Sequence, residues 1–460
     1  MYQIDFSKPS HIHFIGIGGI SMSGLAEVLL EEGFTVSGSD AHESALTDRL
    51  TAHGAQISCP QSADNITDDI SAVVYSAAIH PDNPEYAAAA ASGIPMLRRA
   101  EVLGQIMDHY DTSIAVAGTH GKTTTTSMLS HILMEAKTDP TISVGGILPL
   151  IDGNIRVGAK SMFLTEACEY TNSFLSLRPK IGIILNIDAD HLDFFKDLDD
   201  IRHSFHRFAA QIQADGVLII NGDIPDLHEI TDGISCRVVT FSVNGGADYT
   251  ASDISYNNRG CASFICHQPD GKSSGFTLEV PGAHNVANAL AAVAAANCAG
   301  IDAATVARGF ESFHGTNRRF QLKGSLNGAD VIDDYAHHPT EIRATLATAE
   351  NYPHKTLWCV FQPHTYTRTK ALLPEFADAL SMADHVILAD IYAARETDTL
   401  GISSRTLQKE IQERGTVCDY FPSFGEIEDF LRANVREGDL VLTVGAGDIV
   451  KVGDALTAKN

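Results

Sequence analysis

One stretch constrains the fold of this chain more than any other part of it. An apolar run over residues 113–117 ends in Gly-Thr-His-Gly-Lys-Thr, residues 118–123, and an apolar helical pattern follows over residues 128–133. A strand, a glycine-rich loop and a helix in this order form a phosphate cradle. Glycines let backbone N–H groups close on an anion, and the helix N-terminus adds partial positive charge. The stretch therefore predicts a parallel-sheet α/β domain that binds phosphate.

Lys122 and Thr123 are the chemically important side chains of this loop. The lysine ammonium can reach terminal phosphates, and the threonine hydroxyl can bind Mg²⁺. A standard phosphate loop has a glycine five residues before its Gly-Lys pair, whereas this chain has Val116 there, so the loop is a shortened variant. The alternative is a glycine-rich turn with an incidental lysine, which the flanking strand and helix patterns disfavour.

Length and charge narrow the class of protein. The 460 residues predict about three domains. The formal net charge of −26, from 32 basic and 58 acidic residues, argues against a general nucleic-acid binder. No run reaches the ~18 apolar residues of a membrane span, and the start, Met-Tyr-Gln-Ile-Asp-Phe, lacks a signal-peptide pattern. Eight scattered cysteines without a C-x-x-C pair predict reduced thiols. We therefore expect a cytoplasmic protein with no nucleic-acid or membrane partner.

The predicted first domain, residues 1–110, opens like a Rossmann-type β-α-β unit. A strand over residues 11–17 leads into a glycine motif and a helix, and a second strand over residues 34–37 leads to Asp40. An acidic residue some two dozen positions past the first glycine is typical of dinucleotide sites. Ser21 stands where the third glycine of that motif belongs, so the pattern leaves open a nucleotide diphosphate or NAD.

The predicted second domain, residues 111–318, contains two acidic clusters that each follow a strand, at residues 165–170 and 186–193. In an open parallel sheet, ligands gather outside the carboxyl ends of the strands, so both clusters fall at the edge that carries Lys122. Mg²⁺ prefers carboxylate oxygens, phosphate oxygens and water. We therefore predict a magnesium site at this edge, although spacing alone makes His191 a loop histidine.

The rest of the chain completes an α/β fold class. Residues 248–280 predict short antiparallel strands, and an alanine-rich helix follows from His284, where Asn and His either cap the helix or present amides to a purine base. The predicted third domain, residues 319–460, has four strands with polar ends, which indicates a functional face. Arg318 and Arg319 form either a phosphate-binding pair or a solvated turn. We predict a Rossmann-like N-terminal domain, a central P-loop ATPase-like parallel-sheet domain and a C-terminal Rossmann-like α/β domain.

The chain resembles the Mur ligase family, whose members join amino acids to peptidoglycan precursors, over essentially all of its length. Six stretches carry the resemblance: Gly-Ile-Gly-Gly-Ile-Ser-Met-Ser-Gly at 16–24, Gly-Thr-His-Gly-Lys-Thr-Thr at 118–124, Asn-Ile-Asp-Ala-Asp-His-Leu-Asp at 186–193, His-Asn-Val-Ala-Asn at 284–288, Asp-Asp-Tyr-Ala-His-His-Pro-Thr-Glu at 333–341 and Phe-Gln-Pro-His-Thr-Tyr-Thr-Arg at 361–368. The last two favour the alanine-adding branch or its peptide-recycling relative.

The resemblance implies a reaction that uses ATP and Mg²⁺. ATP would phosphorylate the lactyl carboxylate of UDP-N-acetylmuramate, and the amine of L-alanine would attack the resulting acyl phosphate. The implied catalytic residues are Lys122, His191, Arg319, His338 and Arg368, and the implied magnesium ligands are Thr123, Glu166 and His191. The implied ATP-binding residues are Gly118, Thr119, His120, Gly121, Lys122, Thr123, Thr124, His284, Asn285, Asn288, Arg319 and Asp334. The implied substrate-binding residues are Gly18, Gly19, Ser39, Asp40, Ser76, Arg98, Tyr335, His338, His364 and Arg368.

Two departures and three rival functions accompany this prediction. Some relatives have Arg directly after Phe-Gln-Pro-His, where this chain has Thr365, so Arg368 would carry more of the substrate charge. The carbamylated lysine of other Mur ligases has no equivalent here. The rivals are a murein tripeptide ligase acting on the same sugar nucleotide, an NAD-dependent oxidoreductase and a nucleotide-switched binding protein. We expect a monomer or weak homodimer, and the sequence leaves open the discrimination among alanine, serine and glycine.

Overall fold

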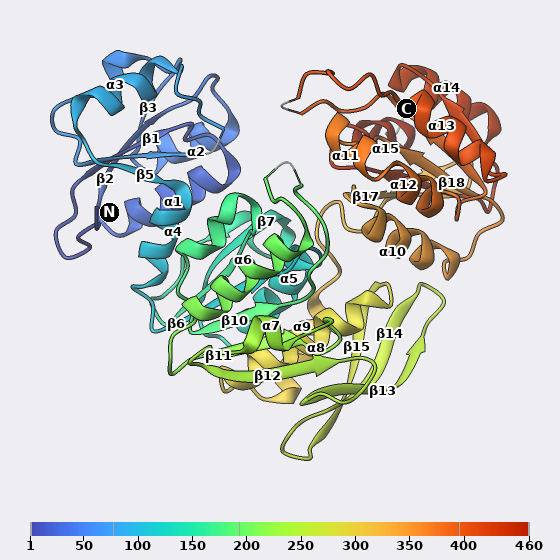
Figure 1. Cartoon of the computed structure of the whole chain (residues 1–460), viewed down its shortest axis with the longest axis horizontal. Helices are drawn as coiled ribbons and strands as arrows, with labels where there is room; N and C mark the ends of the chain where they lie inside the picture. Colours follow the sequence, from blue (N-terminus) through green and yellow to red (C-terminus); the bar gives the residue numbers. More distant parts are fainter. Residues whose placement is uncertain (1, 77, 193, 395, 459–460) are drawn as a thin grey trace. The chain divides into compact units, whose positions relative to one another are not determined.

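The computed structural model describes residues 2–76, 78–192, 194–394 and 396–458, which form three β-sheets flanked by helices (Figure 1). They fall into two compact units. The first unit contains residues 1–187, 199–240 and 291–309, and the second contains residues 188–198, 241–290 and 310–460. The domain boundaries predicted at residues 110 and 318 stay predictions. No helix among the described residues is long and apolar enough to cross a membrane.

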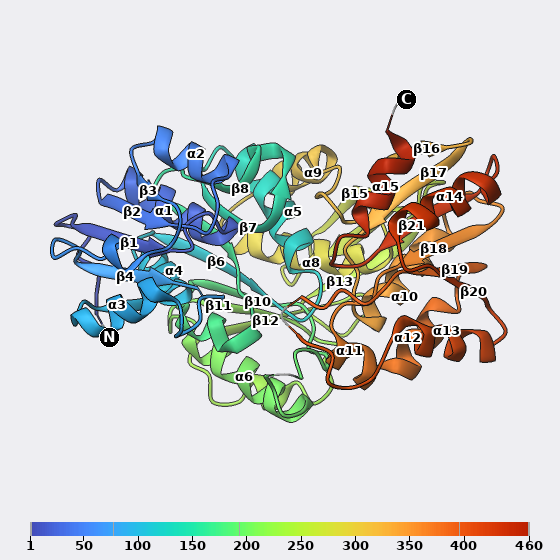
Figure 2. The ribbon, with the colours of Figure 1, turned by 90° about the horizontal axis from the view of Figure 1, so that it is seen from above.

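The first unit opens with a parallel five-stranded sheet of order β3-β2-β1-β4-β5. This order matches the first five strands of the doubly wound Rossmann order 3-2-1-4-5-6, which confirms the predicted fold class for this part of the chain. Figure 2 shows α3 on the face of the sheet opposite α1 and α2. The elements are β1 (His11–Ile15), α1 (Ile20–Glu31), β2 (Thr35–Ser39), α2 (Ala45–Ala52), β3 (Gln56–Ser58), β4 (Ala72–Tyr75), α3 (Pro84–Ser92), β5 (Met96–Arg98) and α4 (Arg99–Met107).

The second sheet has ten strands, and the first unit holds its part with the order β12-β11-β10-β6-β9-β7-β8. Its central strands β11, β10, β6, β9 and β7 run parallel, and β8 returns antiparallel at the edge. Helix α5 packs against β6, β7 and β9 through Met128, Leu129, Ile132 and Leu133, which are fully buried. The elements are β6 (Thr112–Ala117), α5 (Lys122–Glu135), β7 (Thr141–Leu148), β8 (Gly153–Arg156), β9 (Met162–Glu166), β10 (Ile181–Ile184), α6 (Leu198–Gln211), β11 (Val217–Asn221), α7 (His228–Thr231) and β12 (Arg237–Ser242).

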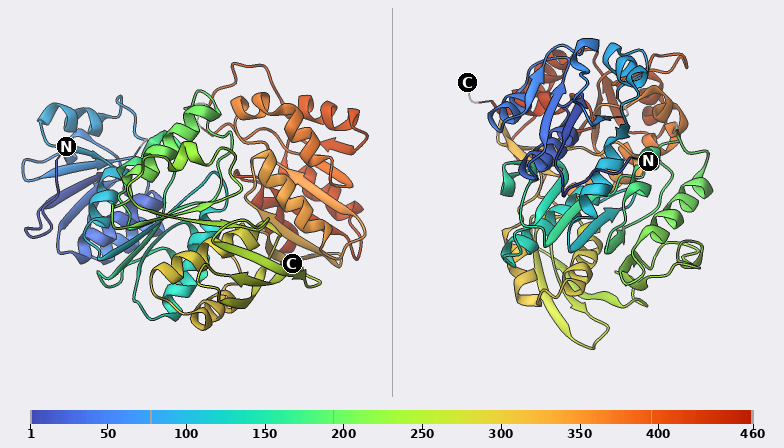
Figure 3. Two further views of the ribbon diagram at one scale, coloured as in Figure 1. Left: turned by 60° about the horizontal axis from the view of Figure 1, so that its bottom comes forward. Right: turned by 90° about the vertical axis from the view of Figure 1, so that its left-hand side faces the viewer.

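The second unit contains an antiparallel meander, as residues 248–280 predict. Figure 1 and Figure 3 show β13, β14 and β15 side by side, and the register confirms that β14 pairs antiparallel with both neighbours. The elements are β13 (Tyr249–Tyr256), β14 (Cys261–His267), β15 (Ser273–Pro281), α8 (His284–Cys298) and α9 (Ala303–Ser312). The boundary between the two units runs through β12, α8 and α9.

A six-stranded sheet of order β16-β17-β21-β18-β19-β20 completes the second unit. All its strands are parallel except β16 at the edge. One apolar core joins the sheet to α10, α12 and α13, and another joins the opposite face to α14 and α15 (Figure 2). The elements are β16 (Gln321–Leu326), β17 (Ala329–Asp334), α10 (Pro339–Glu350), β18 (Leu357–Phe361), α11 (Tyr366–Ala371), α12 (Leu373–Leu380), β19 (His385–Leu388), α13 (Ser404–Glu413), β20 (Val417–Tyr420), α14 (Phe424–Asn434), β21 (Leu440–Val444) and α15 (Val450–Thr457).

Several strand predictions have the wrong ends. The strand predicted over residues 11–17, for example, is β1, which ends at Ile15. The strand predicted over residues 34–37 is β2, which starts one residue later and extends to Ser39. Ser39 pairs with Ile15 of β1 and Ser58 of β3, so neighbours far away in the sequence lengthen the strand. The strand predicted over residues 180–186 is β10, which ends at Ile184. Its last paired residue faces Ala117 of β6, where the phosphate loop begins.

Candidate active site

The loop between β6 and α5 requires its two glycines. Gly118 has φ +143°, and a Cβ there would lie 2.9 Å from the Leu185 Cβ and 3.2 Å from the Leu185 backbone nitrogen. Gly121 caps α5 with φ +84°. Both backbone conformations favour glycine, and the first position also leaves no space for a side chain. The sequence therefore builds this loop tightly against the end of β10.

Lys122 lies at the start of α5 with its ammonium held inside the loop. Its Nζ donates to the carbonyls of Gly118 (2.5 Å) and Thr119 (3.1 Å) and pairs with the Glu169 carboxylate at 2.9 Å. Burial disfavours the charged ammonium, but the carboxylate of Glu169 outweighs it, with help from Cys168 and Glu166, so the pKa of Lys122 is raised. Lys122 therefore remains a cation aimed at the phosphate loop.

Sequence reasoning missed Glu169 as the partner of this lysine. Glu169 is buried, with only 4% of its side chain exposed, and it follows β9 in the acidic cluster that the sequence analysis placed at this edge of the sheet. The expectation that ligands gather at the carboxyl ends of parallel strands located the cluster, but it did not identify the carboxylate that faces the loop. A carboxylate this deeply buried requires a cation beside it, and Lys122 is that cation.

Asn186 is a second residue that the sequence analysis left without a role. Its Oδ1 accepts from the backbone N–H of His120 at 2.8 Å, and its Nδ2 donates to the carbonyl of the same residue at 3.0 Å. The backbone carbonyl of Asn186 also accepts from Thr119 N–H at 3.2 Å. Three hydrogen bonds from one residue after β10 thus fix the middle of the phosphate loop.

The predicted oxygen ligands for Mg²⁺ in the first unit are Thr123 and Glu166. Thr123 lies in the first turn of α5 and is buried, and Thr124 follows it half-buried. Glu166 ends β9, next to β6 in a parallel register, and its Oε1 accepts from Gly145 N–H at 2.6 Å. A hydroxyl and a carboxylate are the hard oxygen donors that Mg²⁺ prefers, so these two residues fit a magnesium ion.

The N-terminal sheet brings together the residues predicted for the sugar nucleotide. Parallel strands end at one edge, and the residues that end or follow β1, β2, β4 and β5 there are Gly18, Gly19, Ser39, Asp40, Ser76 and Arg98. Asp40 Oδ2 accepts from Gly18 N–H at 2.9 Å, and Gly19 is the N-cap of α1. The edge therefore presents a glycine loop at a helix N-terminus beside polar strand ends, an arrangement suited to a nucleotide diphosphate.

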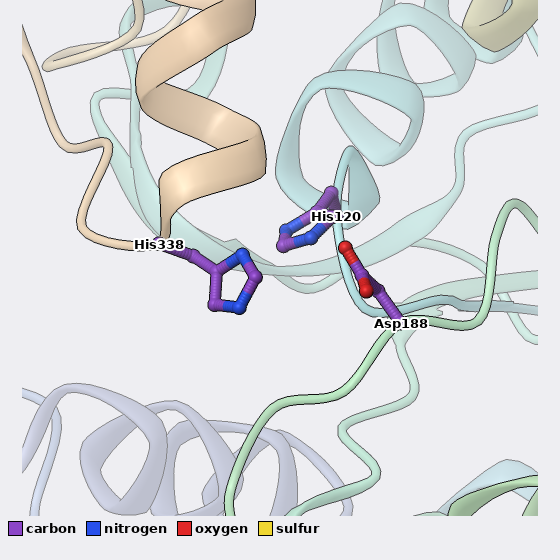
Figure 4. A group of neighbouring side chains, drawn as sticks. All are labelled: His120, Asp188 and His338. Carbon is purple, nitrogen blue, oxygen red and sulfur yellow. The ribbon is translucent and has the colours of Figure 1, made fainter. Parts of the chain in front are cut away.

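In the second unit, the segment from Asp188 contacts the start of α10. The Asp188 carboxylate accepts from Thr340 Oγ1 at 2.7 Å, and Asp188 and His338 offer ligand atoms within 4.8 Å of each other (Figure 4). His338 Nε2 donates to the Ala189 carbonyl at 3.1 Å, and its Nδ1 accepts from Thr340 N–H at 3.3 Å. These two partners assign the proton of the imidazole to Nε2. Asp188 is a polar neighbour of His338 that the sequence analysis did not single out.

Arg368, which is predicted to bind substrate, contacts two neighbouring side chains. Its guanidinium donates to Asp190 Oδ1 at 2.9 Å and lies 3.3 Å from His364 Nδ1. Burial opposes ionisation of Asp190, but the charge of Arg368 prevails, aided by neighbouring histidines, so the pKa of Asp190 is held well below its usual range. Burial, with help from His337 and Arg368, lowers the pKa of His364 to about 4. His364 is therefore neutral at physiological pH.

Two other predicted residues of the second unit flank this region. His191, in the segment after Asp188, has φ +54°, and its Nε2 lies 3.8 Å from Asp190 Oδ2. Thr365, where some relatives have arginine, has φ +68°, which is strained for a β-branched residue.

The two arginines before β16 have different surroundings. Arg318 donates to Asp333 and to the carbonyls of Gly445 and Gly447, which are structural contacts. The Arg319 guanidinium lies 5.4 Å from the ring centroid of Tyr335, in cation–π contact.

Asp334 follows this pair at the end of β17. Its carboxylate accepts from the backbone N–H groups of Phe320 and Ala336, at 2.8 Å each. Burial raises its pKa to about 6 despite Arg319. Asp334 therefore fixes the backbone directly after Arg319 and just after the end of β17.

The asparagines at the start of α8 bond to the chain itself. Asn285 Nδ2 donates to the Pro281 carbonyl at 2.7 Å, and Asn288 Nδ2 donates to Asn285 Oδ1 at 2.9 Å. Both side chains are buried, and His284 is the first residue of the helix. These amides donate to a carbonyl and to a side-chain oxygen, whereas a helix N-cap accepts from backbone N–H groups, so both interpretations drawn from sequence stay predictions.

Comparison with known proteins places these observations in a family. Three family descriptions match consecutive parts of the chain: "Mur ligase family, catalytic domain" over residues 11–111, "Mur ligase middle domain" over residues 116–296 and "Mur ligase, glutamate ligase domain" over residues 318–447. The UDP-N-acetylmuramate–L-alanine ligase of Agathobacter rectalis is 60% identical over 459 residues and covers 100% of both chains. The enzyme of the same name from Lachnospira eligens is 59% identical and covers 99% of this chain and 100% of its own.

Solved structures agree with the sequence relatives. The UDP-N-acetylmuramate-alanine ligase of Thermotoga maritima matches with a TM-score of 0.79 and 31% identity, over 97% of this chain and 98% of that one. A murein peptide ligase of Psychrobacter arcticus matches with a TM-score of 0.71 and 25% identity, over the same shares of the two chains. The predicted resemblance is confirmed, and the chain belongs to the Mur ligase family.

Proposed function

We propose that this chain is an ATP-dependent ligase that joins L-alanine to the lactyl carboxylate of UDP-N-acetylmuramate, a step of peptidoglycan precursor synthesis. The observation that carries the proposal is the phosphate loop with its buried, cationic Lys122, in a chain whose full-length relatives at 50–60% identity bear that enzyme's name. The reaction proceeds in two balanced steps. A carboxylate oxygen bonds to the terminal phosphorus of ATP as ADP leaves, and the amine then bonds to the acyl carbon as phosphate leaves.

The residues of the first unit supply charge and orientation for the first step. Lys122 neutralises the transferred phosphoryl group, and the N-terminus of α5 adds its partial positive charge. Gly118, Thr119, His120 and Gly121 form the phosphate loop, and Asn186 fixes its backbone by accepting from the N–H groups of Thr119 and His120. Thr123 and Glu166, with His191, would hold magnesium, which supplies charge neutralisation at phosphate oxygens when bound.

The remaining assignments follow the same family likeness. Gly18, Gly19, Asp40 and the neighbouring strand ends bind the sugar nucleotide. His284, Asn285, Asn288, Arg319 and Asp334 serve ATP, and Tyr335, His338, His364 and Arg368 serve the amino acid and carboxylate. We propose further that the enzyme works in the cytoplasm as a monomer or weak homodimer, with no nucleic-acid or membrane partner, and contributes to cell-wall growth and division.

One rival shares the chemistry, and the relatives disfavour it. A murein peptide ligase has the same fold, but its match is 25% identical against 31% for the alanine ligase structure. Membership of the ligase family leaves the NAD-dependent oxidoreductase and the nucleotide-switched binding protein without support. An ADP-release assay with L-alanine, L-serine, glycine and a murein tripeptide as amine donors separates the rivals. Turnover with L-alanine is expected. Turnover with the tripeptide but not with L-alanine would show that the chain is a murein peptide ligase instead.

Lys122→Ala tests the phosphate loop directly. Without the ammonium, the charge that develops during phosphoryl transfer loses its buried cation, so ADP formation should fall by at least about 100-fold. Lys272→Ala removes an exposed lysine that pairs with Asp270 and should leave the rate unchanged. Equal rates in wild type and Lys122→Ala would show that the loop does not carry the reaction.

A further inference from the structure

A buried polar strip crosses the N-terminal sheet beneath α3. Glu85, in the first turn of α3, has none of its surface exposed, and its Oε1 lies 2.6 Å from His13 Nε2 on β1. A carboxylate accepts, so the imidazole N–H is the donor in this pair. His13 Nδ1 contacts the Ser37 hydroxyl at 2.7 Å, and His11 Nε2 contacts the same hydroxyl at 2.7 Å. The strip therefore continues across β1 and β2 toward the surface.

The location of this strip is unusual for its chemistry. On the same face of the sheet, the apolar side chains of Ile15 and Val73 form one core cluster with Ala89 of α3. Burying a carboxylate and an imidazole costs desolvation free energy that well-packed apolar side chains would avoid. His11, His13, Ser37 and Glu85 are not among the sugar-nucleotide residues predicted from the motifs, so the motifs leave these four side chains unexplained.

Ser39 lies at the inner end of the polar strip and binds the backbone of the glycine loop. Ser39 Oγ donates to Glu85 Oε2 at 2.5 Å, and Ser39 is fully buried. The carbonyl of Ser39 accepts from the N–H groups of both Gly16 and Ile17, at 2.8 and 2.9 Å. The next residue, Asp40, accepts from Gly18 N–H. Three successive amides of the glycine loop thus depend on two residues at the end of β2.

We propose that Glu85 is a positioning residue for the sugar nucleotide: through Ser39 it sets the glycine loop of residues 16–19. The loop backbone is fixed by where Ser39 and Asp40 lie, because they accept from its N–H groups, and Glu85 anchors Ser39 from inside the domain. His13 completes the anchor by pairing with the other carboxylate oxygen. The inference rests on the proposed function, in which this loop binds UDP-N-acetylmuramate, and adds a residue that never touches that ligand.

The expected effect is on binding and not on the chemical step. Glu85→Ala removes the anchor, so the KM for UDP-N-acetylmuramate should rise about tenfold while kcat changes less than about twofold, the pattern of lost uniform binding. The KM values for ATP and L-alanine should stay unchanged. Glu85→Gln keeps an oxygen for His13 and an amide that can donate to the Ser39 hydroxyl, so it should restore most of the affinity.

Ser39→Ala tests the same contact from its other side and keeps the test decisive if Glu85→Ala fails to fold. It should raise the same KM about tenfold. Where both variants fold, the double variant should be no worse than Ser39→Ala alone, because both changes break one linkage. Additive losses, or an unchanged KM in Ser39→Ala, would overturn the positioning role.

Ser37→Ala is the matched control within the strip. It removes the hydroxyl that contacts His11 and His13 but leaves the Glu85–Ser39 bond, so it should lower thermal stability without moving the KM for the sugar nucleotide. If Ser37→Ala raises that KM as much as Glu85→Ala does, the strip acts only through general stability. Wild-type ADP release with UDP-N-acetylmuramate and L-alanine is measured first, and its absence would reject the proposed function instead of this inference.

Discussion

Glu169 and Lys122 form a buried ion pair whose two members have different consequences for the site. The lysine faces the phosphate loop, whereas the carboxylate keeps the lysine charged, since burial alone would favour the neutral amine. Removing one partner of such a pair leaves an uncompensated charge. At the scale of single residues, the active site is therefore adjusted by neighbours that never touch the substrate.

Glu169→Gln should make Lys122 easier to deprotonate. With the carboxylate gone, burial lowers the lysine pKa, so the alkaline limb of the pH profile of kcat/KM for ATP should move down by about one pH unit. Glu229→Gln makes the same change at the half-exposed partner of Arg202 and should leave the profile in place. An unmoved alkaline limb in Glu169→Gln would contradict the role given to Glu169.

His364 should make the stability of the second unit depend on pH. Its folded pKa of about 4 lies below the ordinary value of 6.5, so the unfolded chain binds a proton first as the pH falls. The stability this group contributes is complete above pH 6.5 and is lost as the pH falls toward 4. Between about pH 7.5 and about pH 5, wild type should lose about 1 kcal/mol more than His364→Asn in urea unfolding, after allowance for solvent screening of a partly exposed ring.

His42 provides a comparison for this measurement. It is exposed, so His42→Asn should lose as much stability over the same pH interval as wild type does. Equal losses of unfolding free energy in wild type and His364→Asn would show that the surroundings of His364 do not hold it neutral.

The elements around the phosphate loop act as one assembly. Strand β6 delivers the loop, α5 supplies its helix N-terminus, and β10 with Asn186 holds it from the side. Only glycine fits at position 118, because the chain approaches Leu185 too closely there for a Cβ atom. The loop geometry is therefore determined by two strands and a helix together, and a change in any of them should alter phosphate binding.

Gly118→Ala should disturb this assembly more than its size suggests. The added Cβ would lie 2.9 Å from the Leu185 Cβ, and the alanine backbone would have to adopt φ +143°. A displacement of the loop by about 1 Å should reduce ADP formation by about 100-fold. Gly93→Ala, at the C-cap of α3 with φ +79° and open space around it, should cost about 1 kcal/mol of stability and leave the rate unchanged. Similar rates in the two variants would rule out this account of the loop.

At the scale of the whole molecule, charge is the dominant property. An excess of 26 negative charges makes the surface charges of the folded chain repel one another. The phosphate loop nevertheless holds a buried cation, Lys122, in this acidic protein. We therefore expect nucleotide binding to depend on Lys122 and backbone dipoles, because the overall field opposes anions.

Salt should stabilise this chain. Raising NaCl from about 0.01 M to about 0.15 M shortens the Debye length from about 30 Å to about 8 Å and screens the repulsion between distant surface charges. The Tm should therefore rise by a few degrees, and an uncharged solute at equal osmolality should not reproduce the rise. A Tm that falls with salt would mean that attractive surface ion pairs outweigh the repulsion.

Much of the fold was predictable, because local patterns encode it. The apolar runs that become β6, β18 and β21 and the periodic stretch of α5 each specify one element, and alternating strands and helices specify a parallel sheet. The phosphate loop was predictable for the same reason, since its glycines, Lys122 and Thr123 are adjacent in the chain. Strand ends were less predictable, because Ser39 belongs to β2 only through its partners Ile15 and Ser58.

The sequence by itself determined the family, the α/β class and the residues that can meet a phosphate, because each of these depends on neighbours within a short stretch. Only the tertiary structure decided which groups control those residues. Glu169 reaches Lys122 across 47 positions, Asn186 reaches His120 across 66, and Glu85 reaches Ser39 across 46. A sequence pattern carries no record of such pairings, because they arise when parallel strands bring distant chain segments to one sheet edge or beneath one helix.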